Sequence, residues 1–216
     1  MAFRMRKPSL LAIVLGTIVV IILVSLGTWQ LDRRAWKQGL IATIDARIAE
    51  PVVDLPSSLD SDWNYRRVQI VGQVVPGSWF RFPGRTRDGE VRDVLMLLIA
   101  LDDGRVVAAE HGHVGFGEPL PPLPGSVALS GVLRPPGEPG FFTPPNNVSA
   151  NQWFWVELPL MFEIAGMKPS GLTSHYLSPG DWRPRLPNDH LQYALTWFSF
   201  VVIFIVIFVL FHRRKS

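Results

Sequence analysis

The sequence contains no cysteine among its 216 residues. Without thiols the chain can form no covalent c-type haem attachment, no thiolate copper or zinc site and no disulfide exchange centre. Its glycines mostly accompany prolines, which marks turns, and no phosphate-binding, dinucleotide-binding or G-x-S-x-G pattern appears. Glu110, Glu157 and Glu163 are scattered, without the spacing of a catalytic carboxylate pair. Catalysis therefore has no positive support, and we expect a protein that is not an enzyme.

Charge is absent from two long apolar runs, residues 10–26 and 191–211. About 20 apolar residues, at about 1.5 Å each, cross a hydrocarbon core of about 30 Å. Both runs are therefore predicted to be transmembrane helices. The first run could instead belong to a cleaved signal peptide, but it ends in LGTWQLDRR, which offers no small-residue cleavage site. The sequence favours an uncleaved anchor.

Basic residues flank the two runs at the chain ends. Six of the 21 Lys and Arg lie in the tails, whereas all 18 acidic residues lie between or at the edges of the spans, where the remaining 15 basic residues leave a net charge of −3. The high pI therefore does not indicate a nucleic-acid surface. By the positive-inside rule both tails are predicted to be cytoplasmic, although Arg33, Arg34 and Lys37 beyond the first span oppose this orientation. With two spans, the intervening domain would be periplasmic in a bacterial inner membrane.

The predicted fold class is an α+β membrane protein, in which two transmembrane helices flank one extracytoplasmic, mainly antiparallel β domain with short helices. Nineteen prolines, many of them in the loops, suggest fixed, extended connections within that domain. The predicted divisions are a cytoplasmic tail (1–9), transmembrane helix 1 (10–29), a periplasmic β-rich domain (30–188), transmembrane helix 2 (189–211) and a second cytoplasmic tail (212–216).

Hydrophobic periodicity predicts the elements of the middle region. A four-residue repeat continues the first helix to Pro51, where it stops, and then the period changes to two, as in strands. We expect a hairpin around Asp103 and Gly104. The predicted helical repeat is Trp36, Leu40, Ile44 and Ile48; the predicted strands are YRRVQIVGQVV, VRDVLMLLIAL, RVVAAEH, SVALSGVLR, QWFWVEL and LTSHYLSP; and PLMFEIAGM is a predicted short helix.

The threshold of the second span, PNDHLQYALTWF, carries polar and aromatic groups on one helical face. His190, Tyr193, Ala194 and Trp197 recur at i, i+3, i+4 and i+7. Ala194, one turn below the imidazole, is predicted to leave open space on this face. An imidazole above a small residue, flanked by Tyr and Trp, could serve as an axial haem ligand. The alternative is an ordinary interfacial aromatic belt with His190 facing water. The spacing alone leaves both open.

The end of the first span, WQLDRRAWK, places Trp29 and Trp36 seven residues apart with Arg33 between them. One interpretation is an interfacial anchor with a snorkelling cation. The other is that Trp29 and Arg33 line the same outer-leaflet site as His190, because Arg pairs bidentately with carboxylates such as haem propionates.

A third candidate is EHGHVGFG, in which His111 and His113 would point to one side of a strand as a metal pair could. Two histidines make a weak site, since catalytic zinc normally takes three protein ligands. Surface or partner-facing histidines are the competing interpretation.

Several motifs together resemble one known family. LGTWQLDRRAWK, YRRVQIVG, VALSGVLR followed by FFTPPNN and QWFWVEL, and NDHLQYALTWF occur in this order across nearly the whole chain. This pattern is similar to the surfeit-locus family of cytochrome c oxidase assembly factors (the Shy family in yeast). The resemblance implies a two-span inner-membrane protein with an outer domain and no turnover. It also implies an association with haem a through the histidine of the second-span motif, which His190 matches.

One region departs from the family pattern. Where the family usually has a strand like VLVNRGWVP, this chain has VVAAEHGHVGFG, which puts the identity of the oxidase client in question. We expect an assembly factor that binds or presents haem a for the large subunit (subunit I) of a haem-copper oxidase, with a haem a synthase as a second candidate partner. His190 would bind the iron, Tyr193 and Trp197 would pack on the macrocycle beside Trp29, and Arg33 or Arg34 would meet a propionate. The alternatives are a cofactor-free membrane scaffold for an oxidase subunit and, from another class, a metal-dependent periplasmic enzyme built on His111 and His113.

Overall fold

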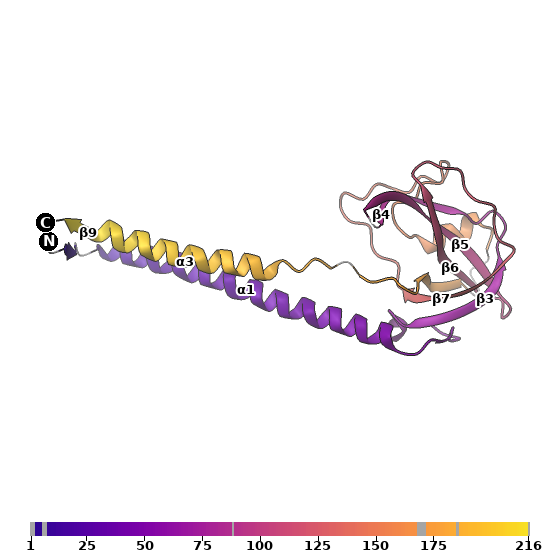
Figure 1. Cartoon of the computed structure of the whole chain (residues 1–216), viewed down its shortest axis with the longest axis horizontal. Coiled ribbons are helices and arrows are strands. Elements are labelled where there is room, and N and C mark those ends of the chain that lie inside the picture. The colour runs from indigo at the N-terminus through magenta and orange to yellow at the C-terminus, as the bar shows by residue number, and fades with distance from the viewer. Residues whose placement is uncertain (1–2, 6–7, 88, 168–171, 185, 216) are drawn as a thin grey trace. The chain divides into compact units, whose positions relative to one another are not determined.

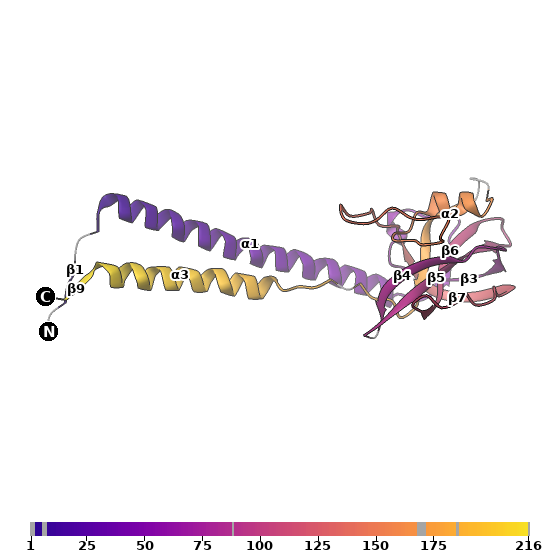
Figure 2. The ribbon, with the colours of Figure 1, turned by 90° about the horizontal axis from the view of Figure 1, so that it is seen from above.

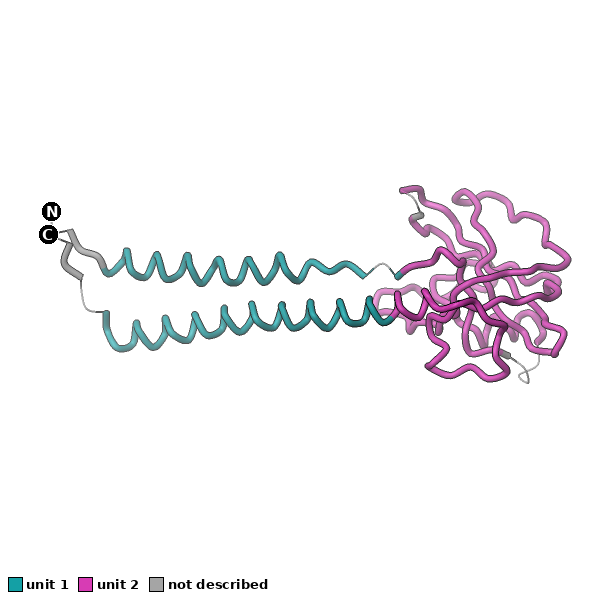
Figure 3. The backbone as a smooth tube through the Cα atoms, turned by 60° about the horizontal axis from the view of Figure 1, so that its bottom comes forward, with its two compact units in different colours: residues 1–43, 184–216 teal, residues 44–183 magenta. Residues whose placement is uncertain are grey.

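The computed structural model describes the chain except residues 1–2, 6–7, 88, 168–171, 185 and 216. The chain divides into two compact units, residues 1–43 with 184–216, and residues 44–183 (Figure 3). The first unit holds most of helix α1 (Leu10–Ala49), all of α3 (His190–His212) and a short antiparallel pairing of β1 (Phe3–Met5) with β9 (Arg213–Lys215).

Helices α1 and α3 lie side by side in two views (Figures 1 and 2). Both are long and apolar enough to cross a membrane: their most apolar windows have mean hydropathies of 3.0 and 2.8, and only 6% of each window is buried in the protein. An apolar surface of this extent facing outward is expected for helices solvated by lipid. Ser9 begins α1, because its Oγ accepts a hydrogen bond from the amide of Ala12 at 3.2 Å, as an N-cap does.

The second unit is a curled, mostly antiparallel sheet. Strands β3, β7, β8, β6 and β5 are hydrogen-bonded in this order, and a further β3–β5 pairing returns to β3, so that the sheet closes into a barrel. β4 adds to the outer edge of β5, β2 pairs in parallel with β3, and the β6–β8 pairing is also parallel. The strands are β2 (Val53–Asp54), β3 (Arg67–Val74), β4 (Phe80–Arg87), β5 (Glu90–Leu101), β6 (Val106–Gly115), β7 (Ser126–Arg134) and β8 (Leu172–Pro179).

Closure of the barrel depends on a glycine in β3. Gly72 pairs with Val127 of β7 and also with Leu101 of β5, so it stands where β3 changes partners. A Cβ at this position would lie 2.4 Å from the carbonyl oxygen of Ala100. Only a residue without a side chain lets the two strands approach this closely.

Strand β5 is buried on both faces. Residues 95–99 are each at most 1% exposed, because alternate side chains enter two apolar clusters on opposite sides of the strand. One cluster lies between the barrel strands and includes Leu97 and Ile99; the other includes Met96, Leu98 and the buried residues of helix α2 (Leu158–Ile164). This double burial explains why VLMLLIAL is continuously apolar instead of alternating.

The predicted architecture of two terminal helices around a mainly antiparallel β domain is confirmed, as are the hairpin, the short helix and most strands. The hairpin turns at Gly104, whose φ is +84°. Of the predicted helical stripe, Ile44 and Ile48 are buried, whereas Trp36 and Leu40 are exposed.

The prediction of a strand over QWFWVEL is wrong. Residues 152–157 form a loop with isolated bridges at Gln152, and Leu158 already begins α2. Trp153 enters the core, edge-on to Phe80 with ring centres 5.2 Å apart. The side chain of Asn146 takes the place of a strand partner, because its Oδ1 accepts the amide of Phe154 at 2.8 Å. The segment is rich in aromatic residues because Trp153 fills part of the core. This composition resembles that of a strand, although the segment forms no strand ladder.

Candidate functional site

The thresholds of the two membrane helices meet through a pair of polar side chains. Nδ1 of His190, the first residue of α3, lies 2.8 Å from Oε1 of Gln30 in α1. About two turns farther along α1, the ammonium group of Lys37 donates to the backbone carbonyl of Pro187. The motifs WQLDRRAWK and PNDHLQYALTWF, which are far apart in the sequence, therefore contact each other within the helical unit.

The Gln30 contact, with the amide oxygen facing the ring, favours one tautomer of a neutral His190. An amide oxygen only accepts hydrogen bonds, so Nδ1 must carry the proton that it donates. Nε2 then carries the lone pair. A histidine that binds a metal through one ring nitrogen usually donates the other N–H to a polar partner, which orients the ring. The contact with Gln30 is therefore compatible with a ligand role for His190.

Below this pair the helices pack closely. A Cβ at Gly27 of α1 would lie 2.6 Å from the ring of Phe198 in α3, so this glycine makes room for the aromatic ring. Ala194, between His190 and Phe198 on α3, is 1% exposed. The small residue therefore does not leave an open space one turn below the imidazole, as its size suggested, because the packing of the helical unit covers it.

The two flanks of the α1–α3 pair carry different side chains. If Gln30 and His190 face each other, a rotation of about 100° per residue projects Gly27 and Phe198 to one flank, where they do make contact. The same rotation projects Trp29, Arg33 and Tyr193 to the opposite flank. Trp29 is 54% and Tyr193 57% exposed. This flank, which we call the aromatic flank, combines exposed rings and a cation beside His190.

The remaining predicted residues lie around these positions. The guanidinium of Arg33 sits 4.2 Å from the ring centre of Trp36, a cation–π contact within α1. Arg34 is half-buried, and its spacing of four from Gln30 puts it on the stripe that faces α3. Trp197 is half-buried and packs edge-on against Phe200 at 6.0 Å. Sequence reasoning missed Gln30 as the partner of His190, although its place beside Trp29 was a signal.

The His111 and His113 motif lies at the outer end of β6, in the domain. Both histidines line a hollow of about 390 Å³ together with Trp79 and a proline-rich segment, Pro121–Pro124. Within the described ranges, no group of three or more His, Cys, Asp or Glu side chains gathers in a way that could hold a metal ion. A third protein ligand for a zinc enzyme is thus missing from the described part of the chain.

Glu110, just before these histidines, belongs to a half-buried polar cluster. Its Oε1 lies 3.3 Å from Nη1 of Arg134 and 3.0 Å from Oγ of Ser178. The Arg134 guanidinium also stacks 4.1 Å from the ring centre of Trp182 and 4.9 Å from that of Tyr176. Burial raises the pKa of Tyr176 to about 12, so this phenol stays protonated at physiological pH. These internal contacts indicate a structural role for the cluster.

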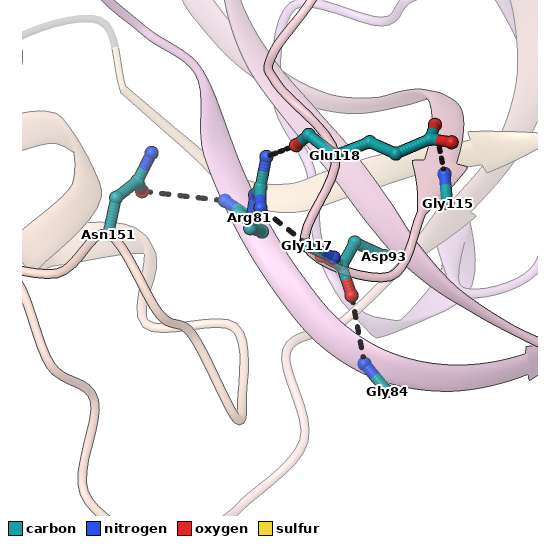
Figure 4. Close-up of polar contacts among 7 residues, drawn as sticks. All are labelled: Arg81, Gly84, Asp93, Gly115, Gly117, Glu118 and Asn151. Carbon is teal, nitrogen blue, oxygen red and sulfur yellow. Dashed lines mark hydrogen bonds and ion pairs between the residues drawn. The ribbon is translucent and has the colours of Figure 1, made fainter.

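An ion pair between half-buried Arg81 and buried Asp93 joins β4, β5 and two loops, and no sequence pattern predicted it (Figure 4). Asp93 of β5 is 1% exposed, pairs with Arg81 at 3.4 Å and accepts the amides of Gly84 and Gly117, each at 3.2 Å. Arg81 also donates to the carbonyl of Glu118, and its amide meets Oδ1 of Asn151 at 3.4 Å. A buried carboxylate with this set of donors is satisfied, so the group stabilises the loops and leaves no atom for a ligand.

Comparison with known proteins gives one consistent result. The model of the SURF1 family matches residues 17–202. The chain is 30% identical to the mouse protein named Surfeit locus protein 1, over 81% of this chain and 67% of that protein. It is 26% identical to a SURF1-like protein of Monosiga brevicollis, over 92% of this chain and 86% of the relative, and 24% identical to a SURF1-like protein of Rickettsia conorii, over 89% and 88%. The similarity includes both helix thresholds and the whole β domain.

Proposed function

Because this chain belongs to the SURF1 family, whose members are known as cytochrome oxidase assembly factors, we propose that it binds haem a at His190 and presents it to the large subunit of the oxidase. The observation that carries the proposal is the Gln30–His190 hydrogen bond, which leaves Nε2 with its lone pair. Neutral imidazole with a fixed orientation is the common axial ligand of haem iron.

The donor set fits a haem on the aromatic flank and not between the helices. Ala194 is covered, so the macrocycle has no room on the α1-facing side of α3. Trp29 and Tyr193 are more than half exposed on the aromatic flank, where their rings can contact a porphyrin face. Arg33 lies beside them, and its guanidinium can pair with a propionate at the membrane–water boundary, whereas Arg34, on the stripe that faces α3, is the less well placed of the two predicted cations. When bound, the haem would be the cargo, and the residues would hold and orient it.

The charge distribution supports the membrane topology that we propose. Both tails are basic, and the two candidate membrane helices make this a membrane protein. We place both termini in the cytoplasm and the β domain in the periplasm of a bacterial inner membrane. His190 then lies at the outer boundary, and the oxidase subunit and a haem a synthase are the membrane partners that the proposal expects.

The test is to co-express the chain with a haem a synthesis pathway and record the absorption spectrum of the purified protein. We expect a haem a spectrum in the native chain, its loss in His190→Ala, and weakened retention in Gln30→Leu, because that variant removes the partner that orients the ring. Gln192→Ala, an exposed position on the same helix turn, is the matched control and should behave as native. A native chain without pigment, or a His190→Ala variant with an unchanged spectrum, contradicts the ligand assignment.

A cofactor-free scaffold is the second candidate, and the coverage of Ala194 favours it. In that case the Gln30–His190 bond only fastens the two helices at their outer ends. The same purification distinguishes the two functions, since a stable complex with the oxidase subunit that carries no pigment supports the scaffold.

A further inference from the structure

The loop between β7 and α2 carries the most exposed aromatic pair described in the domain. Phe141 and Phe142 are 95% and 91% exposed, and their rings contact each other edge-to-face with centres 5.0 Å apart. Each phenylalanine can bury roughly 150–250 Å². Here two neighbouring rings at one loop tip remain exposed. An exposed apolar surface of this kind indicates a site that contacts another apolar surface or a membrane.

The part of this loop that carries the rings, residues 135–145, is held on both sides, so the rings are presented on a fixed support. Arg134, at its start, is bonded to Glu110 and Ser178. Asn146, at its end, accepts the amide of Phe154 at 2.8 Å and donates to a carboxylate oxygen of Glu157 at 3.0 Å. Five prolines, 135, 136, 139, 144 and 145, restrict the backbone between these anchors. Ordering the loop on contact therefore costs little conformational entropy.

The backbone of the tip suits a lipid environment. The amide of Thr143 bonds to the carbonyl of Gly140 at 2.9 Å, and the Thr143 hydroxyl accepts the amide of Gly140, also at 2.9 Å. The five prolines have no N–H to satisfy. Glu138 is the one charged residue from 135 to 145. The prolines and these two bonds reduce the number of backbone amides that would be left without a partner in an apolar environment.

We propose that the Phe141–Phe142 tip inserts into the interfacial region of the bilayer that anchors the chain, and so forms a third membrane contact besides the two helices. The occupant is lipid because both ends of the domain continue into membrane helices, which keeps a bilayer surface at high effective concentration. Prolines stiffen the tip and reduce its number of backbone amides, and its two rings are exposed. A bilayer can therefore bury the rings without a protein partner of complementary shape.

The absence of native cysteine allows a site-specific test on the full chain. A nitroxide is attached to Phe142→Cys, and the chain is reconstituted in phosphatidylcholine bilayers without any haem synthesis pathway. We expect the nitroxide to collide more with oxygen, which concentrates in lipid, than with a water-soluble nickel complex. Phe116→Cys is the matched control, since Phe116 is a lone phenylalanine, 68% exposed, in another turn, and its label should favour the nickel complex.

Phe141→Ser in the Phe142→Cys background should shift the label toward water, because the second ring is lost. Position 142 is almost fully exposed, so the variants should fold as the native chain does. A label at 142 that is as accessible to nickel as the label at 116 overturns the proposal. So does a label that becomes protected only when the oxidase subunit is added, which would indicate a protein surface. Neither result depends on haem, so this experiment tests the membrane contact independently of the proposed haem-binding function.

Discussion

His175 is a buried imidazole whose protonation should set part of the pH dependence of stability. The residue is 5% exposed in β8, its Nε2 lies 2.7 Å from Oδ1 of Asn64, and its Nδ1 lies 2.9 Å from the hydroxyl of Ser174. Because Oδ1 can only accept, Nε2 carries the proton and Nδ1 accepts from the serine. Burial lowers the pKa of His175 below its ordinary value, and the charge of Asp60 opposes this only in part.

We therefore expect the domain to lose stability as pH falls below the unfolded pKa of about 6.5. In that range the unfolded chain binds a proton that the folded chain refuses, so unfolding is favoured, by at most about 1.4 kcal/mol for each pH unit. The loss ends once the pH drops below the folded pKa. The measurement is chemical unfolding of the full chain in nanodiscs between pH 7.5 and 5, followed by tryptophan fluorescence.

His175→Gln should flatten this dependence, whereas His113→Gln, at an exposed histidine, should leave it unchanged. Equal pH slopes in the native chain and His175→Gln would show that the carboxylates alone cause the acid loss.

At the same scale, the sequence singled out one of the two residues in the Gln30–His190 contact and missed the other. His190 was recognisable because a polar aromatic group at the threshold of an apolar run is unusual, and its spacing from Trp197 needs only helical geometry. Gln30 was not recognised as its partner, since helical spacing within one segment does not give the rotation of a second helix against it. Ala194 was misinterpreted for the same reason, because a small residue either leaves a gap or admits a neighbour.

At the scale of elements, Gly27 controls how closely α1 and α3 approach. Gly27→Leu places a branched side chain where a Cβ alone would meet Phe198 at 2.6 Å, so the helices should separate at this level and the Gln30–His190 contact should weaken. Gly39→Leu is the control in the same helix, since a Cβ there has no heavy atom within 4 Å. Both substitutions change the intrinsic helix propensity from that of Gly to that of Leu, so this contribution cancels when the two variants are compared.

The measurement uses cysteines at positions 30 and 190 and a short bismaleimide on the reconstituted chain. Cross-linking should fall in the Gly27→Leu background and persist with Gly39→Leu. Undiminished cross-linking in both would mean that the Phe198 ring rotates away and that the glycine is dispensable.

Element prediction succeeded where hydrophobic periodicity was uninterrupted. β3 alternates, β5 is continuously apolar, and the Asp103–Gly104 turn marks the hairpin, so each followed from local pattern. β4 was missed because Pro83 and Gly84 stand in its middle, where the pairing with β5 shifts register between Phe82 and Arg85. A proline within a strand is tolerated at such a bulge, and that exception depends on the partner strand and not on the segment itself.

At the scale of the whole molecule, the charge distribution determines which side of the membrane each part should occupy. The six basic residues of the tails resist translocation, and the three beyond the first span do not outnumber them. Placing the tails inside puts His190 and the aromatic flank at the outer boundary, together with the β domain. The proposed function depends on this orientation, because an inverted chain would offer its imidazole at the cytoplasmic face.

A membrane-impermeant maleimide can test the orientation, since the native chain offers it no thiol. In spheroplasts of a bacterial host, Ser149→Cys, on an exposed turn of the domain, should be labelled from outside, whereas Ser216→Cys should react only after the membrane is opened. Replacing Arg4, Arg6 and Lys7 with glutamine should reduce labelling at position 149, because the orientation then rests on the C-terminal tail against Arg33, Arg34 and Lys37. Labelling of Ser216→Cys in intact spheroplasts would show that the cations beyond the first span prevail, and His190 would then lie on the cytoplasmic side.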